Sequence, residues 1–384
     1  MALIDFKVSG YRSIKNVWLR LRPVNVIVGP NGCGKSNLYK SMYLLHCAAK
    51  GTLAAVLAEE GGIDSVIWAG PVSKNEAKLV PRMRLSIRSD KFEYNMMCAR
   101  TSPKSAPYTF GSDPEIKEED FYLIKGTQRY TLVKRRKSFI EARNAEGKMV
   151  EYTERVLPSE SVLSSLRDFN NFPELFAIRE EILNWRFYHN FRTDIDSPMR
   201  KKQISAMTPV LSDDGRDLAA AFETIRELGD GDLLMETLEE AFPGSHFQVK
   251  TEGTSRRFLT MQTKGIGRLL EAREFSDGTL QYVCLVCALL CLRPPTLLAI
   301  NEPEGSLHSQ LLEPLAKLIV NASENTQIWL TTHSRQLADA ILELTGHEPI
   351  ELGMVKGETT LLNVGLGGYR ESDDLEVSEK PEPD

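Results

Sequence analysis

The segment that most constrains the fold is residues 29–36, which read G-P-N-G-C-G-K-S and match the pattern G-x-x-x-x-G-K-S/T. A short apolar stretch at 24–28 precedes this segment, and a helical pattern follows from Lys35 to about Ala49. Glycines allow backbone N–H groups to turn inward around phosphate oxygens, and the first turn of the helix directs its positive end at the same anion. This strand, loop and helix therefore predict a phosphate-binding loop for a nucleotide.

The types of side chain in the loop predict individual roles. Lys35 is expected to reach the β- and γ-phosphates of ATP, and the Ser36 hydroxyl to bind Mg²⁺. The predicted nucleotide-binding residues of this segment are Asn31, Gly32, Cys33, Gly34, Lys35, Ser36 and Asn37.

A second apolar strand, L-L-A-I-N-E at 297–302, ends far downstream in an acidic residue. Glu302 is placed to polarise an attacking water, although a solvated carboxylate at the end of a strand is the alternative. Asn301 occupies the position where such strands usually carry an aspartate that holds Mg²⁺ through water. An amide keeps the oxygen but loses the charge, so the sequence leaves open whether hydrolysis is slowed.

Two further segments can contact phosphate. A third apolar strand, at 327–333, ends in His333. This position predicts that His333 senses the γ-phosphate; the alternative is a core histidine at a strand end. Before an apolar helix, the turn F-S-D-G-T-L-Q places Ser276 and Gly278 at a helix N-terminus, where anions bind. The alternative is an ordinary N-cap, formed by Ser276 or Asp277.

Composition indicates a soluble globular protein without an overall basic character: 384 residues, 42% hydrophobic, 26% charged, net charge −6. No signal peptide or apolar run of membrane-spanning length is found, so we expect a cytoplasmic protein with reduced thiols.

Cys284, Cys287 and Cys291 are spaced as one side of a buried helix, which favours core packing over a metal site. DNA contact would depend on local basic clusters, although such a cluster is more often a solvated face: 134–137, 200–202 and 256–257.

The pattern along the chain predicts a division into four parts. These are an N-terminal lobe at 1–78, an inserted region at 79–204, a C-terminal lobe at 205–368, and an acidic disordered tail at 369–384. Alternating strands are expected within 79–142, and helical stretches at 161–186 and 218–241.

In order and spacing, these motifs resemble the head of an ABC-type ATPase of the SMC/RecF/OLD group. Walker A lies at 29–36, the signature turn at 276–278, Walker B at 297–302, the D-loop at 304–308, and the switch histidine is His333. The opening I-D-F-K-V-S-G-Y-R-S-I-K-N and the run N-E-P-E-G-S-L-H also resemble this group. The resemblance implies an α/β fold: a P-loop NTPase head with a mixed β-sheet lobe and an inserted β-rich and helical region.

In this family two heads close around two ATP molecules. The resemblance therefore implies that Lys35, Ser36, Glu302 and His333 act on ATP bound to their own chain, with Ser36 and Asn301 at Mg²⁺. Ser276 and Gly278 would act on ATP held by the second head of a homodimer. Arg12 matches an N-terminal arginine that contacts nucleotide in the family, or is a surface arginine at a strand end.

Several departures from the family pattern separate the functional hypotheses. The signature reads S-D-G-T, residues 61–70 lack the usual glutamine, and no Toprim nuclease follows. We expect an ATPase that dimerises on ATP and acts on DNA or a partner effector protein, in DNA repair or phage defence. The alternative is a nucleotide-gated scaffold with negligible turnover. A transporter ATPase at a membrane is disfavoured, because the missing glutamine normally couples to membrane domains.

Overall fold

The computed structural model describes residues 2–71, 81–101, 113–152, 155–204, 206–253 and 255–363. The chain forms two compact units. The first comprises Met1–Arg22, Gly29–Trp185 and Ile350–Asp384, and the second comprises Pro23–Val28 and Arg186–Pro349.

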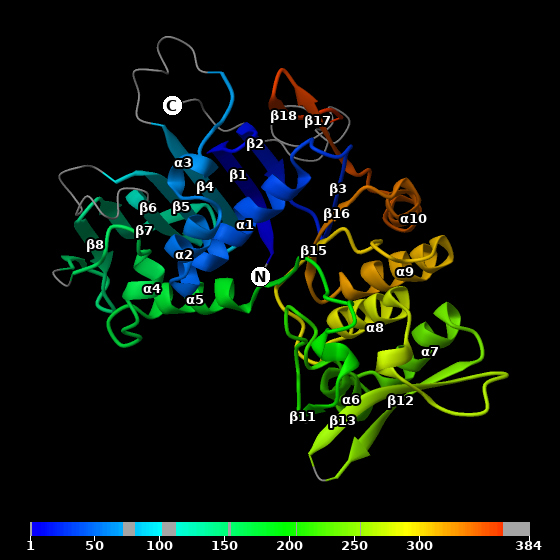
Figure 1. Ribbon diagram of the computed structural model, residues 1–384. Coiled ribbons are helices and arrows are strands. Elements are labelled where there is room, and N and C mark those ends of the chain that lie inside the picture. Colours follow the sequence, from blue (N-terminus) through cyan, green and yellow to red (C-terminus); the bar gives the residue numbers. More distant parts are fainter. Residues whose placement is uncertain are drawn as a thin grey trace. The chain divides into compact units, whose positions relative to one another are not determined.

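The first unit contains a long antiparallel sheet with strand order β2-β1-β4-β5-β6-β7-β8-β9 (Figure 1). Its strands are β1 (Leu3–Tyr11), β2 (Ile14–Arg20), β4 (Arg82–Ser89), β5 (Phe92–Arg100), β6 (Pro114–Lys125), β7 (Gln128–Arg136), β8 (Phe139–Arg143) and β9 (Met149–Glu151). Inward positions alternate along them, as in β4, where Met83, Leu85 and Ile87 are buried. The strands expected in the inserted region therefore extend the N-terminal sheet.

The first unit also contains the helices α1 (Lys35–Lys50), α2 (Leu53–Glu59), α3 (Ile63–Val66), α4 (Val162–Ser165) and α5 (Pro173–Asn184). Of these, α1 and α3 contact this sheet. Helix α1 contacts β1 and β4 of the sheet and also α2, α4 and α5. The unit is completed by the hairpin of β17 (Ile350–Val355) and β18 (Glu358–Leu361).

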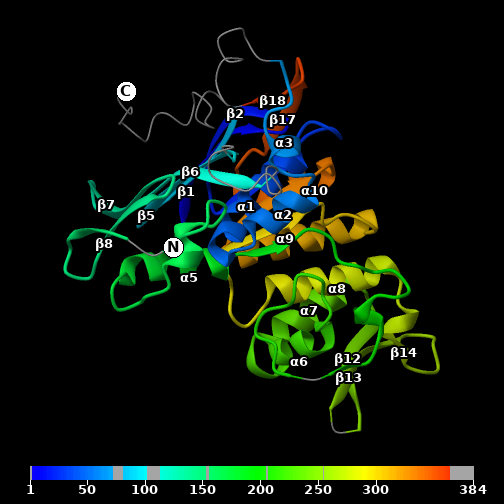
Figure 2. The ribbon, with the colours of Figure 1, turned by 60° about the vertical axis from the view of Figure 1, so that its left-hand side comes forward.

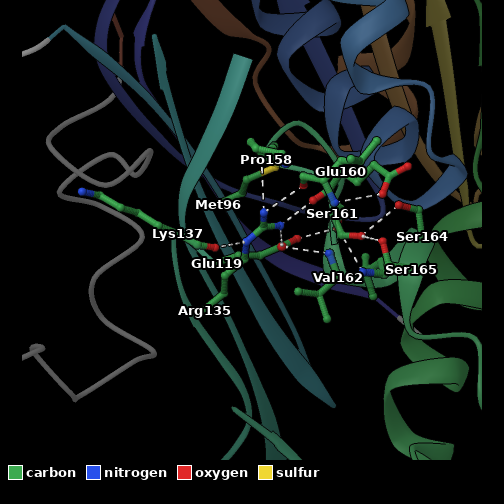
Figure 3. A network of polar contacts seen from close by, with 12 residues as sticks. Met96, Glu119, Arg135, Lys137, Pro158, Glu160, Ser161, Val162, Ser164 and Ser165 are labelled. Atoms are coloured by element: carbon green, nitrogen blue, oxygen red, sulfur yellow. Dashed lines mark hydrogen bonds and ion pairs between the residues drawn. The ribbon is translucent and has the colours of Figure 1, made fainter. Parts of the chain in front are cut away.

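A buried ion pair ties the middle of the sheet to the segment that leads into α4 (Figure 3). Arg135 of β7 lies 3.4 Å from Glu119 of β6, and their side chains are 1% and 0% exposed. The Arg135 guanidinium also donates to the carbonyls of Lys137, Leu157, Pro158 and Glu160. Because each polar group of the arginine has a partner, the charge is tolerated in the core.

Both carboxylate oxygens of Glu119 take part in this network, here called the Arg135–Glu119 clasp. Oε1 accepts hydrogen bonds from the hydroxyls of Tyr94 and Ser161, and Oε2, which faces Arg135, also accepts the Val162 backbone N–H. Burial, and then the neighbouring Glu119 charge, raises the pKa of Tyr94 well above its usual value, so the phenol remains a donor. Ser161 is also the N-cap of α4, and α4 contacts α1. The clasp therefore fixes the sheet to the helices around α1.

In the second unit, parallel strands lie in the order β10-β15-β16-β3. They are β10 (Arg186–Tyr188), β15 (Leu297–Asn301), β16 (Gln327–Thr332) and β3 (Val24–Val28). The last three are mostly apolar and almost fully buried, as expected for strands covered on both faces.

Helices and a smaller antiparallel sheet complete the second unit (Figure 2). The helices are α6 (Leu218–Leu228), α7 (Gly231–Ala241), α8 (Asp277–Leu289), α9 (Leu312–Ala322) and α10 (Arg335–Thr345), with short 3-10 turns at Pro198–Arg200, Ala272–Glu274 and Ser309–Leu311. The sheet contains β11 (Gln203–Ile204), β12 (Ser245–Glu252), β13 (Arg256–Thr263) and β14 (Leu270–Glu271). None of the helices in the described ranges is both long and apolar enough to cross a membrane.

Two of the expected helical stretches are wrong in detail because local turn chemistry interrupts them. The helix predicted at 161–186 is divided into α4 and α5, where Asp168 accepts the backbone N–H groups of Asn170 and Asn171 and Pro173 starts the next helix. The stretch at 218–241 is divided at Gly229, after which Asp230 caps α7.

The predicted division of the chain into four parts remains a prediction. The first unit includes described residues of the predicted inserted region up to Trp185, and β17 and β18 of the predicted C-terminal lobe. The predicted acidic tail at 369–384 lies outside the described residues.

Candidate nucleotide site

The predicted phosphate loop lies at the N-terminus of α1, a helix of 16 residues. Gly32 and Gly34 adopt positive φ angles of 79° and 107°, which favour glycine. The Lys35 ammonium is buried and donates to the carbonyls of Gly29 (2.7 Å) and Pro30 (3.4 Å), so the side chain curls back over the loop. Ser36 is exposed at the same helix end. This arrangement suits an anion.

Two glycines of the loop have no room for a side chain. A Cβ on Gly34 would lie 2.1 Å from the Thr359 hydroxyl, and one on Gly29 would lie 2.5 Å from the Leu352 carbonyl oxygen. The Ser13 and Thr359 hydroxyls are 2.8 Å apart, and Asn37 donates to Ser13 over 2.8 Å. The β1–β2 turn and the β17–β18 hairpin thus hold the loop from both sides. Of the other predicted loop residues, Asn31 is exposed and Cys33 is buried.

Arg12, the predicted N-terminal nucleotide contact, lies in the β1–β2 turn with a φ of 48°. It donates to Glu60 over 2.6 Å, and the same carboxylate accepts Lys40 (2.7 Å) and Tyr11 (3.2 Å). Burial, then the charge of Glu60, raises the pKa of Tyr11. Glu60 therefore holds Arg12 and Lys40 together, a contact that local sequence patterns do not indicate.

In the second unit, three parallel strands end in register at one edge of the sheet. Asn301 of β15 pairs with Thr331 of β16, and Thr332 pairs with Val28 of β3, the residue that directly precedes Gly29 in the chain. Ligands of open parallel sheets bind outside the carboxyl ends of the strands. The residues predicted from the strand ends, Asn301, Glu302 and His333, therefore share this edge.

Asn301, the predicted Mg²⁺ ligand, already makes two hydrogen bonds. Its side-chain oxygen accepts from the Thr331 hydroxyl over 2.8 Å, and its amide nitrogen donates to the His189 carbonyl over 3.4 Å. Glu302 follows with a positive φ of 48°, an uncommon conformation for a residue other than glycine. Its backbone N–H donates to the Thr331 carbonyl, so the turn is fixed to β16 while the carboxylate is 37% exposed.

Glu304 is the acidic residue that contacts the His333 turn most closely. One of its carboxylate oxygens accepts the Thr332 hydroxyl (2.6 Å) and the backbone N–H of His333 (2.7 Å). It also lies 3.0 Å from His333 Nδ1, whereas the nearest Glu302 oxygen is 3.9 Å away. The sequence placed Glu304 only at the start of the D-loop; its separation from β16 along the chain hides this contact.

The signature turn is built on the N-terminus of α8. Ser276 is exposed, and its hydroxyl accepts the Thr279 backbone N–H over 3.1 Å, as an N-cap does. The N-cap alternative is therefore confirmed, and it does not exclude an anion contact. A Cβ on Gly278 would lie 2.5 Å from the Ser306 carbonyl oxygen, so the turn packs tightly on the D-loop of its own chain.

Arg200 anchors this turn from outside and is not a free member of a basic cluster. Its guanidinium donates to the carbonyls of Ala272 and Phe275 and to the Asp277 carboxylate, and its side chain is 8% exposed. Arg135 of the first cluster is likewise buried in its clasp. These two arginines of the basic clusters therefore neutralise protein groups and belong to neither a DNA contact nor a solvated face.

All the cysteines are free and buried, in agreement with the prediction of core packing. Cys284 and Cys287 lie on α8, whereas Cys291 follows its last turn, a small departure from the expected single helix. Burial raises the pKa of the Cys291 thiol to about 11 and that of Cys98 to about 12. The described residues contain no group of histidine, cysteine and acidic side chains that could hold a metal ion.

The comparisons with known proteins agree with these motifs. Residues 24–339 match the model of a family described as "AAA domain, putative AbiEii toxin, Type IV TA system". A solved SMC head bound to the C-terminal winged-helix domain of ScpA superposes with a TM-score of 0.51 at 15% identity, covering 94% of this chain and 98% of that one. This likeness shows the fold of an SMC-type ATPase head. No curated protein matches the chain.

Two other SMC heads are similar at lower scores. The head from Thermotoga maritima gives a TM-score of 0.47 at 15% identity, with 95% and 100% of the two chains covered. The head from Pyrococcus furiosus, bound to the C-terminal domain of ScpA, gives 0.48 at 14% identity, with 94% and 96% covered.

Proposed function

Because this chain belongs to the AAA-domain ATPase family whose model matches residues 24–339, we propose that it binds and hydrolyses ATP and that ATP joins two copies. The observation that carries the proposal is the phosphate loop. There is no space for a side chain at Gly29 or Gly34. The Lys35 side chain lies over the loop, and the long helix α1 begins at Lys35. Backbone N–H groups, a cation and a helix N-terminus converge on one place, which is the arrangement that phosphate requires.

The proposed roles follow from what each side chain can donate or accept. Lys35 exchanges its bonds to loop carbonyls for phosphate oxygens, and Ser36 offers a hydroxyl oxygen. Glu302 accepts a proton from the attacking water, since its carboxylate is partly exposed. His333 contacts the γ-phosphate from the end of β16.

Ser36 and Asn301 each carry an oxygen of the kind that binds Mg²⁺, and bound Mg²⁺ would supply positive charge against the phosphate oxygens. The fit at Asn301 is weaker than at an aspartate, because the amide is neutral and its oxygen already accepts the Thr331 hydroxyl. We therefore expect this protein to hydrolyse ATP more slowly than it would with an aspartate at position 301.

The signature turn supports the proposed dimer. Ser276 is exposed at the N-terminus of a 13-residue helix. Gly278 has no side chain, so the backbone of the turn is not covered at this position. In a two-headed assembly this end would face the phosphates held by the second copy. The solved SMC head with a TM-score of 0.51 is bound to a winged-helix domain of another protein, ScpA. By analogy, we propose that this head passes its movement to a partner protein or to DNA, in repair or defence against phage.

ATP-driven association tests this proposal. The Glu302→Gln variant should retain ATP, because the amide cannot take the proton from water, and should sediment as a dimer with ATP and Mg²⁺ but as a monomer without nucleotide. Adding Ser276→Arg should abolish the dimer by placing a large side chain at the signature turn. Ser255→Arg, at an exposed serine in the β12–β13 turn, is the matched control. A monomer in every condition would disprove the association.

A further inference from the structure

One carboxylate oxygen of Glu304 binds the turn that carries His333. The Glu304 Oε1 atom accepts the Thr332 hydroxyl and the backbone N–H groups of His333 and Ser334, at 2.6, 2.7 and 3.1 Å. The same oxygen lies 3.0 Å from His333 Nδ1. Four donors thus converge on a single oxygen.

The other carboxylate oxygen, Oε2, is buried and has no hydrogen-bond partner among the described residues. The Glu304 side chain is 5% exposed, against 53% for His333. Within the described ranges, the imidazole is the one basic side chain that pairs with this carboxylate. A buried and incompletely satisfied carboxylate holds its donors strongly, because water does not compete for them.

His333 has a second acidic neighbour, and the two compete for the same nitrogen. Glu302 Oε2 lies 3.9 Å from Nδ1, beyond hydrogen-bonding distance, whereas Glu304 lies within it. A histidine that donated to Glu302 would occupy the carboxylate proposed to accept the proton from water. Because Glu304 is more buried than Glu302 and lies closer to His333, we expect His333 Nδ1 to donate to Glu304.

We propose that Glu304 is a positioning residue for ATP hydrolysis: it binds His333 through Nδ1, directs Nε2 outward, and keeps the ring away from Glu302. This inference rests on the proposed function, since it assigns the support of two residues of that site. A carboxylate oxygen only accepts hydrogen bonds, so the hydrogen lies on Nδ1 and the tautomer is fixed.

A double-mutant cycle tests the coupling between Glu304 and His333. Glu304→Gln keeps an acceptor oxygen for the backbone N–H groups, so the turn stays folded, but the neutral amide competes poorly with Glu302 for Nδ1. We expect kcat to fall about 10-fold to 100-fold with little change in KM for ATP, as for residues that orient a catalytic group. In the His333→Ala background, the same substitution should cost less than about twofold.

The control is Glu313→Gln, an exposed glutamate on α9 whose side chain is 71% accessible, which should leave kcat unchanged. An equal loss from Glu304→Gln with and without His333, or a change in KM alone, would overturn the proposal. A purely structural role would give such an equal loss.

A second measurement does not depend on turnover. In ¹⁵N NMR spectra of the imidazole rings, the His333 signals, assigned among six histidines by their absence in His333→Ala, should show the Nδ1–H tautomer. The Glu304→Gln variant should show a mixture of tautomers. The Nε2–H form in the wild type, or the same tautomer in both proteins, would contradict the inference. If the wild type does not hydrolyse ATP, the proposed function fails while this spectrum still decides the role of Glu304.

Discussion

Replacing Arg135 by methionine should lower the free energy of unfolding by about 3–5 kcal/mol, the usual cost of leaving one partner of a buried ion pair alone. Methionine preserves much of the length and apolar volume of the side chain but removes every donor. The Glu119 carboxylate then stays buried without its counter-charge, and the carbonyls of Lys137, Leu157, Pro158 and Glu160 lose their donor (Figure 3). The midpoint of urea unfolding measures the loss.

The neighbouring residue provides a matched control. Arg136 pairs with Asp120 over 2.7 Å, but its side chain is 42% exposed, so Arg136→Met should cost only about 0–1 kcal/mol. Combining Arg135→Met with Glu119→Gln removes both charges and should recover part of the stability. Equal midpoints for Arg135→Met and Arg136→Met would show that the clasp does not stabilise the sheet.

Replacing Lys35 by alanine should abolish nearly all turnover, by about 10²–10³-fold, because one preorganised donor to developing negative charge is lost. Its ammonium lies at the positive end of α1 and is held by the Gly29 and Pro30 carbonyls, so it is in place before the nucleotide arrives. A fluorescent ATP analogue should also bind more weakly in the presence of Mg²⁺.

Lys50, exposed in the last turn of the same helix, is the control for Lys35. Lys50→Ala removes the same charge from the chain and loses about 0.3–1 kcal/mol of interaction with the helix dipole, with no effect on nucleotide. If Lys35→Ala bound the analogue as well as Lys50→Ala does, the loop would not be the phosphate site.

The sequence predicted the elements whose signals are local. The strand before Gly29, the start of α1 at Lys35 and the strands that end at Asn301 and Thr332 are all present. The strands were recognisable because burial on both faces leaves mostly apolar runs. The resemblance to an SMC-type head is confirmed by the family match and by the fold.

Contacts between distant segments were not predictable in the same way. Nothing near Glu60 indicates that it binds Arg12, and nothing near Arg200 indicates that it holds the signature turn. These contacts depend on how elements pack, which a single sequence does not encode locally. Arg135 is an exception: strand alternation puts it on the face of Val133, between exposed Lys134 and Arg136, and this pattern could have indicated burial.

Steady-state ATP hydrolysis by the wild type and by Glu302→Gln, each with and without double-stranded DNA, tests the proposed function. We expect turnover in the wild type that Glu302→Gln lacks, and that rises when DNA is bound. Tight ATP binding with wild-type turnover no higher than that of Glu302→Gln, with or without DNA, would contradict it. The protein would then be an ATP-held scaffold, and Asn301→Asp should raise its rate.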